Sequence, residues 1–134
     1  MEIIVFDKTH FYNTLEIGIN VPVVLKRGSD EAAFEAKVDT GATHCIFERK
    51  HAERLGINVE SGTLERFGTV TGGFITYGHE MTLSVLDIET YSTVYFAAEE
   101  SFNKNVLGQT GWLDHVKLGL IDYEGKLFLA SNNE

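Results

Sequence analysis

The four residues Asp39-Thr40-Gly41-Ala42 are the part of this sequence best suited to chemistry. They follow an alternating apolar stretch that ends at Val38 and precede the apolar pair Ile46-Phe47. A carboxylate at the end of a strand is held rigidly and partly desolvated, as a general acid or base requires. Gly41 lets the backbone approach a neighbour or ligand closely, and the Thr40 hydroxyl can lock the loop through a fixed hydrogen bond.

Two further segments, one glycine-rich and one apolar, follow the Asp39 segment along the chain. The pair Gly72-Gly73, followed by Phe74, predicts the turn of a β-hairpin, because paired glycines accept positive φ. Near the C-terminus, Val106-Leu107-Gly108 joins two apolar residues to a glycine, just before Gln109-Thr110. Taken alone, each segment has an ordinary explanation, as a hairpin turn and as core followed by a turn.

In this order the segments resemble the retropepsins, the retroviral-type aspartic proteases and their cellular relatives, over residues 15–129. Asp39-Thr40-Gly41-Ala42 is similar to the family's catalytic Asp-Thr-Gly-Ala. Gly72-Gly73-Phe74 is similar to the tip of its flap hairpin, and Val106-Leu107-Gly108 to the segment that pins its catalytic loop. The resemblance implies an aspartic endopeptidase with Asp39 as the catalytic residue.

The resemblance also implies a homodimer. An aspartic protease needs two carboxyls about 3 Å apart that share one proton. The chain has one Asp-Thr-Gly, so Asp39 of each subunit would supply one carboxyl across a two-fold axis. The ionised carboxyl would activate a water, and the protonated one would donate to the scissile carbonyl. Peptide or protein substrates would bind as an added strand beneath the flap.

Three positions depart from the family pattern. Cys45 stands where Ser or Thr is usual, Thr43 where Asp or Ser is frequent, and Gln109-Thr110 where Arg-Asp often follows the glycine. The departures spare the reacting carboxyl but open an alternative, a catalytically inactive retropepsin-like domain that binds a peptide or protein partner. A third interpretation is a plain dimerisation module in which Asp39 is a turn residue.

Other reactive side chains have simpler explanations. Neighbours on a strand point to opposite faces, which disfavours His44 and Cys45 as a nucleophilic pair and makes Cys45 a small core residue. The five histidines lack the spacing of metal ligands, so a zinc site is the minority interpretation. We therefore expect no metal and no other cofactor.

The composition predicts a globular protein and argues against some kinds of partner. The chain has 134 residues, 43% of them hydrophobic and 23% charged, which predicts one globular domain over 1–134. A formal net charge of −9 argues against nucleic-acid binding, because phosphates need a basic surface. The single cysteine excludes an internal disulfide. With no signal-peptide pattern and no apolar run of about 20 residues, we expect a cytoplasmic protein without membrane contact.

The elements that must position Asp39 follow a two-residue period. Alternating apolar residues predict strands at 15–25 and 34–38, joined by a turn at Gly28-Ser29-Asp30. Further strands are expected at 64–71, 74–77, 81–86, 91–97, 116–121 and 126–129, and helical segments at 48–55 and 110–115. The pattern predicts a mostly β protein. The resemblance implies a closed antiparallel β-barrel of the acid-protease type, retropepsin-like, with one main short helix and a flap hairpin.

Overall fold

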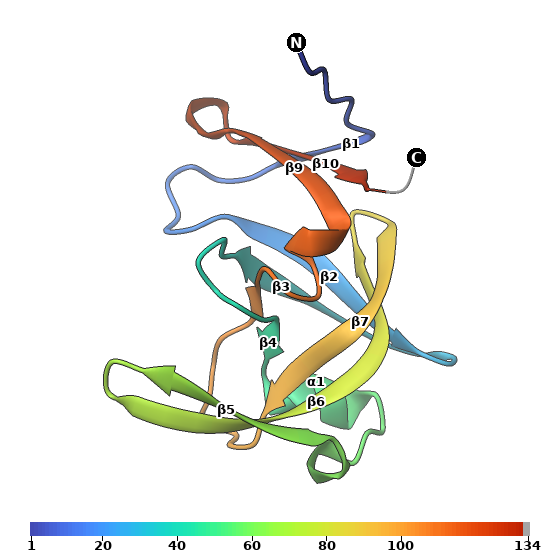
Figure 1. Ribbon diagram of the computed structural model, residues 1–134, viewed down its shortest axis with the longest axis vertical. Helices are drawn as coiled ribbons and strands as arrows, with labels where there is room; N and C mark the ends of the chain where they lie inside the picture. Colours follow the sequence, from blue (N-terminus) through green and yellow to red (C-terminus); the bar gives the residue numbers. More distant parts are fainter. Residues whose placement is uncertain (133–134) are drawn as a thin grey trace.

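The computed structural model of the protein describes residues 1–132, which are mostly β-strand (Figure 1). The strands are β1 (Lys8–Phe11), β2 (Asn20–Arg27), β3 (Asp30–Val38), β4 (Ile46–Phe47), β5 (Thr63–Thr69), β6 (Gly72–Val85), β7 (Ile88–Ala97), β8 (Val106–Leu107), β9 (Val116–Ile121) and β10 (Lys126–Ser131). The helices are α1 (Arg49–Arg54) and the short 3-10 helices η1 (Val59–Ser61), η2 (Leu113–His115) and η3 (Asp122–Glu124). The predicted mostly β class with one main short helix is confirmed.

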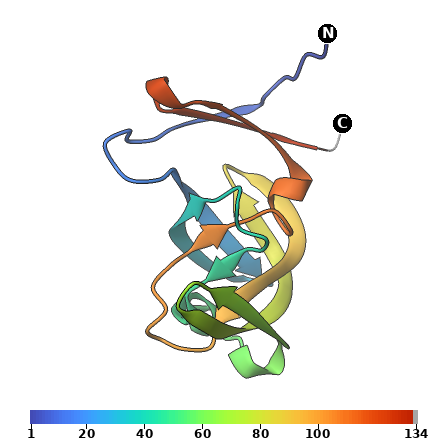
Figure 2. The same cartoon turned by 60° about the vertical axis from the view of Figure 1, so that its left-hand side comes forward.

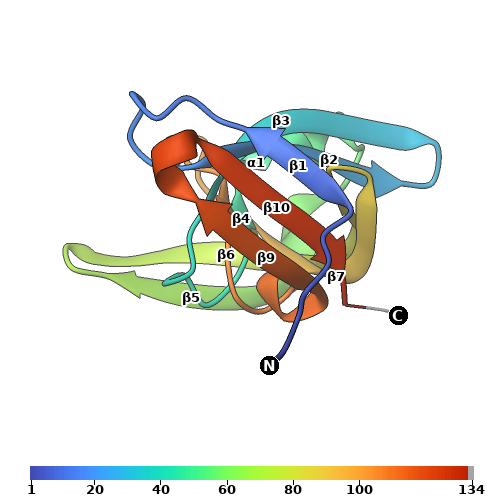
Figure 3. The ribbon, with the colours of Figure 1, turned by 90° about the horizontal axis from the view of Figure 1, so that it is seen from above.

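The strands form two sheets. The larger has the order β2-β3-β8-β4-β7-β6-β5, and β2 also pairs with β6, so the pairing returns to its first strand. The smaller, β1-β10-β9, lies across one end of the larger sheet (Figures 2 and 3). The predicted antiparallel arrangement is wrong for two pairs, because β3 runs parallel to β8 and β4 runs parallel to β7. The closed form of the predicted barrel stays a prediction.

Strand β8 lies between β3 and β4, although β3 and β4 are close in sequence. The loop that joins β3 to β4 must therefore pass over the end of β8. That loop contains Asp39, so the strand order alone brings the Asp39 segment to the segment after β8.

The strand that leads into Asp39 forms by simple alternation. Along β3, Ala32 and Ala36 are buried, Phe34 and Val38 are half-buried, and the residues between them face solvent. The hairpin that β3 forms with β2 turns at residues 28–29, as predicted. The buried side chains of this hairpin belong to the hydrophobic core.

Strand β2 is shorter at its start than the sequence predicts. It pairs with β3 only from Asn20 onward, whereas Leu15 and Ile17 are 92% and 90% exposed in a turn-rich segment. The prediction of a strand from residue 15 is wrong because alternation reports the spacing of apolar residues and not the presence of a pairing strand.

The hairpin of β5 and β6 forms, but its turn lies two residues before the expected one. Gly73 pairs with Gly68, so the turn is Val70-Thr71 and not Gly72-Gly73. Gly72, the first residue of β6, has a φ of +135°, which glycine adopts more readily than other residues.

Two smaller boundary predictions also change. The strand expected at 81–86 ends at Val85, because Leu86 and Asp87 have φ values of +51° and +65° and turn the chain into β7. The helical segment expected at 110–115 is reduced to η2. Helix α1 lies within the expected 48–55, with Gly56 at a φ of +72° just beyond it. No helix among residues 1–132 has the length and apolar character to span a membrane.

Candidate active site

Asp39 is the first residue after β3, and the backbone fixes it there. Its N–H donates to the carbonyl of Leu107 over 2.9 Å, which continues the parallel pairing of Val38 with Leu107. Its carboxyl oxygen Oδ1 accepts a 2.9 Å hydrogen bond from the N–H of Gly41. The half-buried carboxyl is therefore held in one orientation by the chain on either side of it.

The rest of the loop is held by the segment that follows β8. The carbonyls of Ala42 and Thr43 accept hydrogen bonds of 2.8 Å from the N–H groups of Gln109 and Thr110. The N–H of Ala42 donates to the carbonyl of Asp39 over 3.1 Å and closes a tight turn. Thr40 and Gly41, at the tip of this turn, are exposed.

Gly108 is the residue on which this close approach depends. It is buried, and a Cβ at its position would clash with the carbonyl oxygen of His44 and lie 2.8 Å from that of Ala42. Its neighbours also contact the loop, since Leu107 is fully buried beside Val38 and Val106 pairs with Ile46. The structure thus brings the predicted segments 39–42 and 106–108 together.

Two of the departures from the family pattern, Gln109 and Cys45, take part in holding the loop. The side-chain amide of Gln109 donates to the carbonyl of Thr40 over 2.7 Å. The sulfur of Cys45 accepts from the N–H of Gly108 at 3.4 Å. Neither replacement leaves the Asp39 loop without support.

Cys45 is fully buried, as predicted for a core residue. Burial raises the pKa of its thiol to about 12, so the thiol is uncharged at neutral pH and is a poor nucleophile. The ring of the neighbouring His44 packs elsewhere, 5.1 Å from the ring of Phe67 and 5.2 Å from that of Tyr95. Among residues 1–132, no group of three His, Cys, Asp or Glu side chains is placed to hold a metal.

The β5–β6 hairpin extends beyond the body of the molecule, and Val70 in its turn is fully exposed (Figure 1). The ring of Phe67 on β5 packs against the ring of His44, which lies in the loop between β3 and β4. Of the three residues predicted at the hairpin tip, Gly72 and Gly73 lie in the exposed start of β6. Phe74 packs on Phe102, with ring centroids 5.0 Å apart and planes 28° from parallel.

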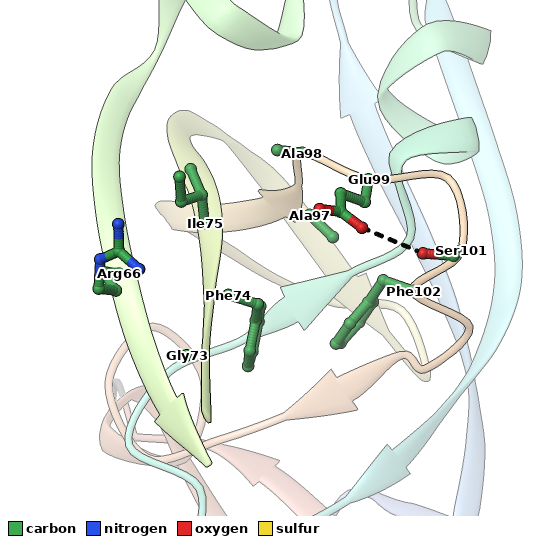
Figure 4. A pocket seen from close by; sticks show the side chains of 9 residues that line it. All are labelled: Arg66, Gly73, Phe74, Ile75, Ala97, Ala98, Glu99, Ser101 and Phe102. Atoms are coloured by element: carbon green, nitrogen blue, oxygen red, sulfur yellow. Dashed lines mark hydrogen bonds between the residues drawn. The ribbon is translucent and has the colours of Figure 1, made fainter. Parts of the chain in front are cut away.

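A pocket of about 400 Å³ opens between the hairpin and the loop after β7. Figure 4 shows Phe74 and Phe102 side by side in its lining, with Arg66 on the β5 side. A hydrogen bond of 3.3 Å from Ser101 to Glu99 shapes the loop wall. This pocket offers an apolar, aromatic surface on the hairpin side of the site.

A second pocket, of about 380 Å³, lies on the other side of the same loop and is polar. Its lining comes from β2, β3, the Asp39 position and the loop before β8: Asn20, Glu35, Lys37, Asp39, Asn103, Lys104, Asn105 and Val106. The sequence analysis missed both lysines. One signal was present, because Lys37 lies two residues before Asp39 and therefore on the same face of the strand.

Comparisons with known proteins agree with this geometry. A family model described as "Aspartyl protease" matches residues 21–110, which include the Asp39 loop and the segment after β8. The structure is similar to that of the EIAV protease complexed with the inhibitor HBY-793, with a TM-score of 0.55 and 21% sequence identity. That similarity covers 73% of this chain and 86% of the EIAV protease chain and supports a retropepsin-like fold. No curated protein matches the sequence significantly.

Proposed function

The chain belongs to the aspartyl protease family, and we propose that it is an aspartic endopeptidase that acts as a homodimer. The observation that carries the proposal is the attachment of the Asp39 loop to the segment Leu107–Thr110, which fixes one carboxyl at the surface. A single fixed carboxyl is half of the pair that this chemistry requires. The site is therefore incomplete without a second copy of the chain.

The second Asp39 would come from a partner related by a two-fold axis. The bond from Gly41 to Oδ1 orients the carboxyl, and both of its oxygens keep a lone pair for the shared proton. Two carboxylates about 3 Å apart do not both ionise, so the pair keeps one proton between them. Thr40 is exposed at the loop tip, and its hydroxyl would contact the partner's loop across the axis.

The reaction follows from this charge state. The ionised carboxyl takes a proton from a bound water, whose oxygen attacks the carbonyl carbon of the peptide bond. The protonated carboxyl gives its proton to the carbonyl oxygen as negative charge develops there. Collapse of the tetrahedral intermediate breaks the C–N bond, and the leaving amine takes a proton from the pair. A hydroxyl of the intermediate returns its proton to the pair as the new carboxyl group forms, so the pair again holds one proton. Gly41 and Ala42 shape the loop backbone and take no part in proton transfer.

The surface available for a second copy includes apolar residues that the single chain leaves exposed. Ile3 and Val5, in the segment before β1, are 78% and 74% exposed, and Leu120 of β9 is 43% exposed. These residues belong to the smaller sheet or to the chain leading into it. Burying them against a partner offsets the repulsion between two chains that each carry a charge of −9.

The β5–β6 hairpin is the proposed flap. Its exposed turn and the exposed pair Gly72-Gly73 beside it suit an element that closes over a peptide and excludes water. Phe67 and Phe74 would then line the substrate side of the hairpin, next to His44 and Phe102.

Replacement of Asp39 by asparagine tests the proposal against the inactive peptide-binding alternative. The Asp39→Asn variant keeps the shape of the side chain but removes its ionisation, so we expect peptide cleavage to be lost while the melting temperature is kept. A peptide library incubated with each protein and analysed by mass spectrometry provides the measurement, and pepstatin should block the wild-type activity. Equal cleavage by both proteins contradicts the proposal, and peptide binding by a wild-type protein that cuts nothing favours the alternative.

A further inference from the structure

We propose that this protease selects substrates with an acidic side chain, Asp or Glu, directly beside the scissile bond, and that Lys37 and Lys104 bind this side chain. The inference rests on the proposed function and names the substrate class of the same site. It concerns the polar pocket of about 380 Å³ that Asp39 helps to line. A peptide held at Asp39 must place a neighbouring side chain in or at the mouth of that pocket.

The two lysines approach the pocket from different elements. Lys37 lies on β3, on the same face as Asp39, and Lys104 lies on the loop before β8. The stem of Lys37 packs over Gly18, where a Cβ would lie 2.7 Å from the lysine Cε. This packing restricts the conformations of the Lys37 side chain.

The ion pairs of lysine and arginine among residues 1–132 involve other residues than these two lysines. Five basic residues make an ion pair within residues 1–132: Lys8, Lys26, Arg49, Lys50 and Lys126. Lys37 and Lys104 make none with the described residues. In a chain with 20 acidic and 11 basic residues, two unpaired ammonium groups beside the reacting carboxyl are available for an anion from outside.

The acidic residues of the pocket do not cancel this charge. Glu35 offsets one lysine. Asp39 offsets less than one, because the proposed carboxyl pair shares a proton and each member carries on average half a charge. A basic substrate side chain would meet two ammonium groups, and a neutral one would leave both without a partner. A carboxylate is the side chain that this lining complements best.

The asparagines refine the assignment. The Asn105 amide donates to Glu48 over 2.7 Å, and its oxygen accepts from the Glu48 N–H over 3.0 Å, so this side chain is already engaged. The uncharged polar side chains left to contact a substrate beside the lysines are those of Asn20 and Asn103.

A matched set of peptides tests the inference. One peptide that the wild-type protein cuts is remade with Glu, Gln or Lys at each position flanking the scissile bond, and kcat/KM is measured at about 0.15 M salt. Two partly exposed ion pairs predict that Glu exceeds Gln by about five- to tenfold, and that Lys is the poorest. The variant Lys37→Gln/Lys104→Gln should bring the Glu-to-Gln ratio to about one. Lys50→Gln, on α1 and outside the pocket, should leave the ratio unchanged.

The same peptides are also titrated against the Asp39→Asn variant, so that binding is measured without cleavage. Cleavage with no preference for Glu, or a preference that survives the double lysine variant, overturns the inference and leaves the proposed function standing. Tighter binding of the Glu peptide by a protein that cuts nothing keeps the inference and overturns the proposed function. The absence of both cleavage and binding overturns both.

Discussion

The Asp39 loop and the β5–β6 hairpin flank the candidate site and are held in opposite ways. The loop is bonded to β8 and the segment after it through three backbone hydrogen bonds and a side-chain bond from Gln109, and the Gly41 N–H holds the Asp39 carboxyl within the loop. The hairpin is held by its own ladder, by Phe67 against His44 and by Phe74 against Phe102, and its turn at Val70 is fully exposed. The Asp39 carboxyl thus lies in a segment bonded to its neighbours, while the proposed flap has fewer contacts with the rest of the protein.

The largest effect is expected from a methyl group placed in the loop attachment. Gly108→Ala should destabilise the protein by about 3 kcal/mol and abolish cleavage, because its Cβ meets the carbonyls of His44 and Ala42. Gly68→Ala in the hairpin is the matched control, since a Cβ there has no neighbour within 4 Å. Its free energy of unfolding should stay within about 0.5 kcal/mol of wild type. Equal destabilisation in urea titrations of the two variants would contradict the comparison.

A smaller effect is expected where a side chain supports the loop. Gln109→Ala removes the 2.7 Å hydrogen bond to the carbonyl of Thr40. The residue is exposed, so the loss of stability should be about 0.5–1.5 kcal/mol. Because Thr40 follows Asp39, we expect kcat to fall several-fold while KM changes little. A variant in which KM rises and kcat is kept would assign Gln109 to substrate binding instead.

A substitution in the hairpin turn should lower activity without lowering stability. Val70→Ser changes a fully exposed side chain, so thermal stability should stay within about 0.5 kcal/mol of wild type. The loss of an apolar contact with bound peptide should nevertheless lower kcat/KM by about threefold to tenfold. Unchanged steady-state kinetics would show that this hairpin is not the flap.

Acid pH should lower the stability of the protein through His51. His51 of α1 is buried against the ring of Phe34 on β3, and its Nε2 lies 3.5 Å from Glu48 without a hydrogen bond. Burial lowers the pKa of His51 below its ordinary value of 6.5. The unfolded chain therefore binds the proton more readily, and stability present above pH 6.5 is lost as pH falls below it.

The His51→Phe variant separates this residue from the other groups that titrate. It keeps a ring to stack on Phe34 and removes the buried imidazole, so its melting temperature should vary less between pH 7.5 and about pH 5 than that of wild type. The same pH dependence in both proteins would assign the effect to another group.

The sequence predicted the parts of this site that depend on local patterns. Alternation placed Asp39 at the end of β3, and the resemblance to the retropepsins implied that residues 106–108 hold its loop. The strand expected from residue 15 failed because Leu15 and Ile17 alternate with polar residues without a strand to pair with.

The remaining differences depend on contacts between distant segments. The parallel pairing of β3 with β8 has no local signature, because each strand has the same period whatever its partner's direction. Lys104 lies in a polar loop whose composition predicts only exposure, and its position beside Lys37 and Asp39 follows from the folded chain. Paired glycines marked the β5–β6 hairpin but not its turn, since Val70-Thr71 also satisfies a two-residue connection.

The central claim, that each subunit supplies one carboxyl to a shared pair, is tested most directly by mixing. Wild-type and Asp39→Asn chains are combined at constant total concentration, allowed to exchange subunits, and assayed for peptide cleavage. If an active pair needs Asp39 from both chains, an equal mixture should show about one quarter of the wild-type rate, because only dimers of two wild-type chains are active. A rate of about one half, in proportion to the wild-type fraction, would show that each chain acts alone and would contradict the account.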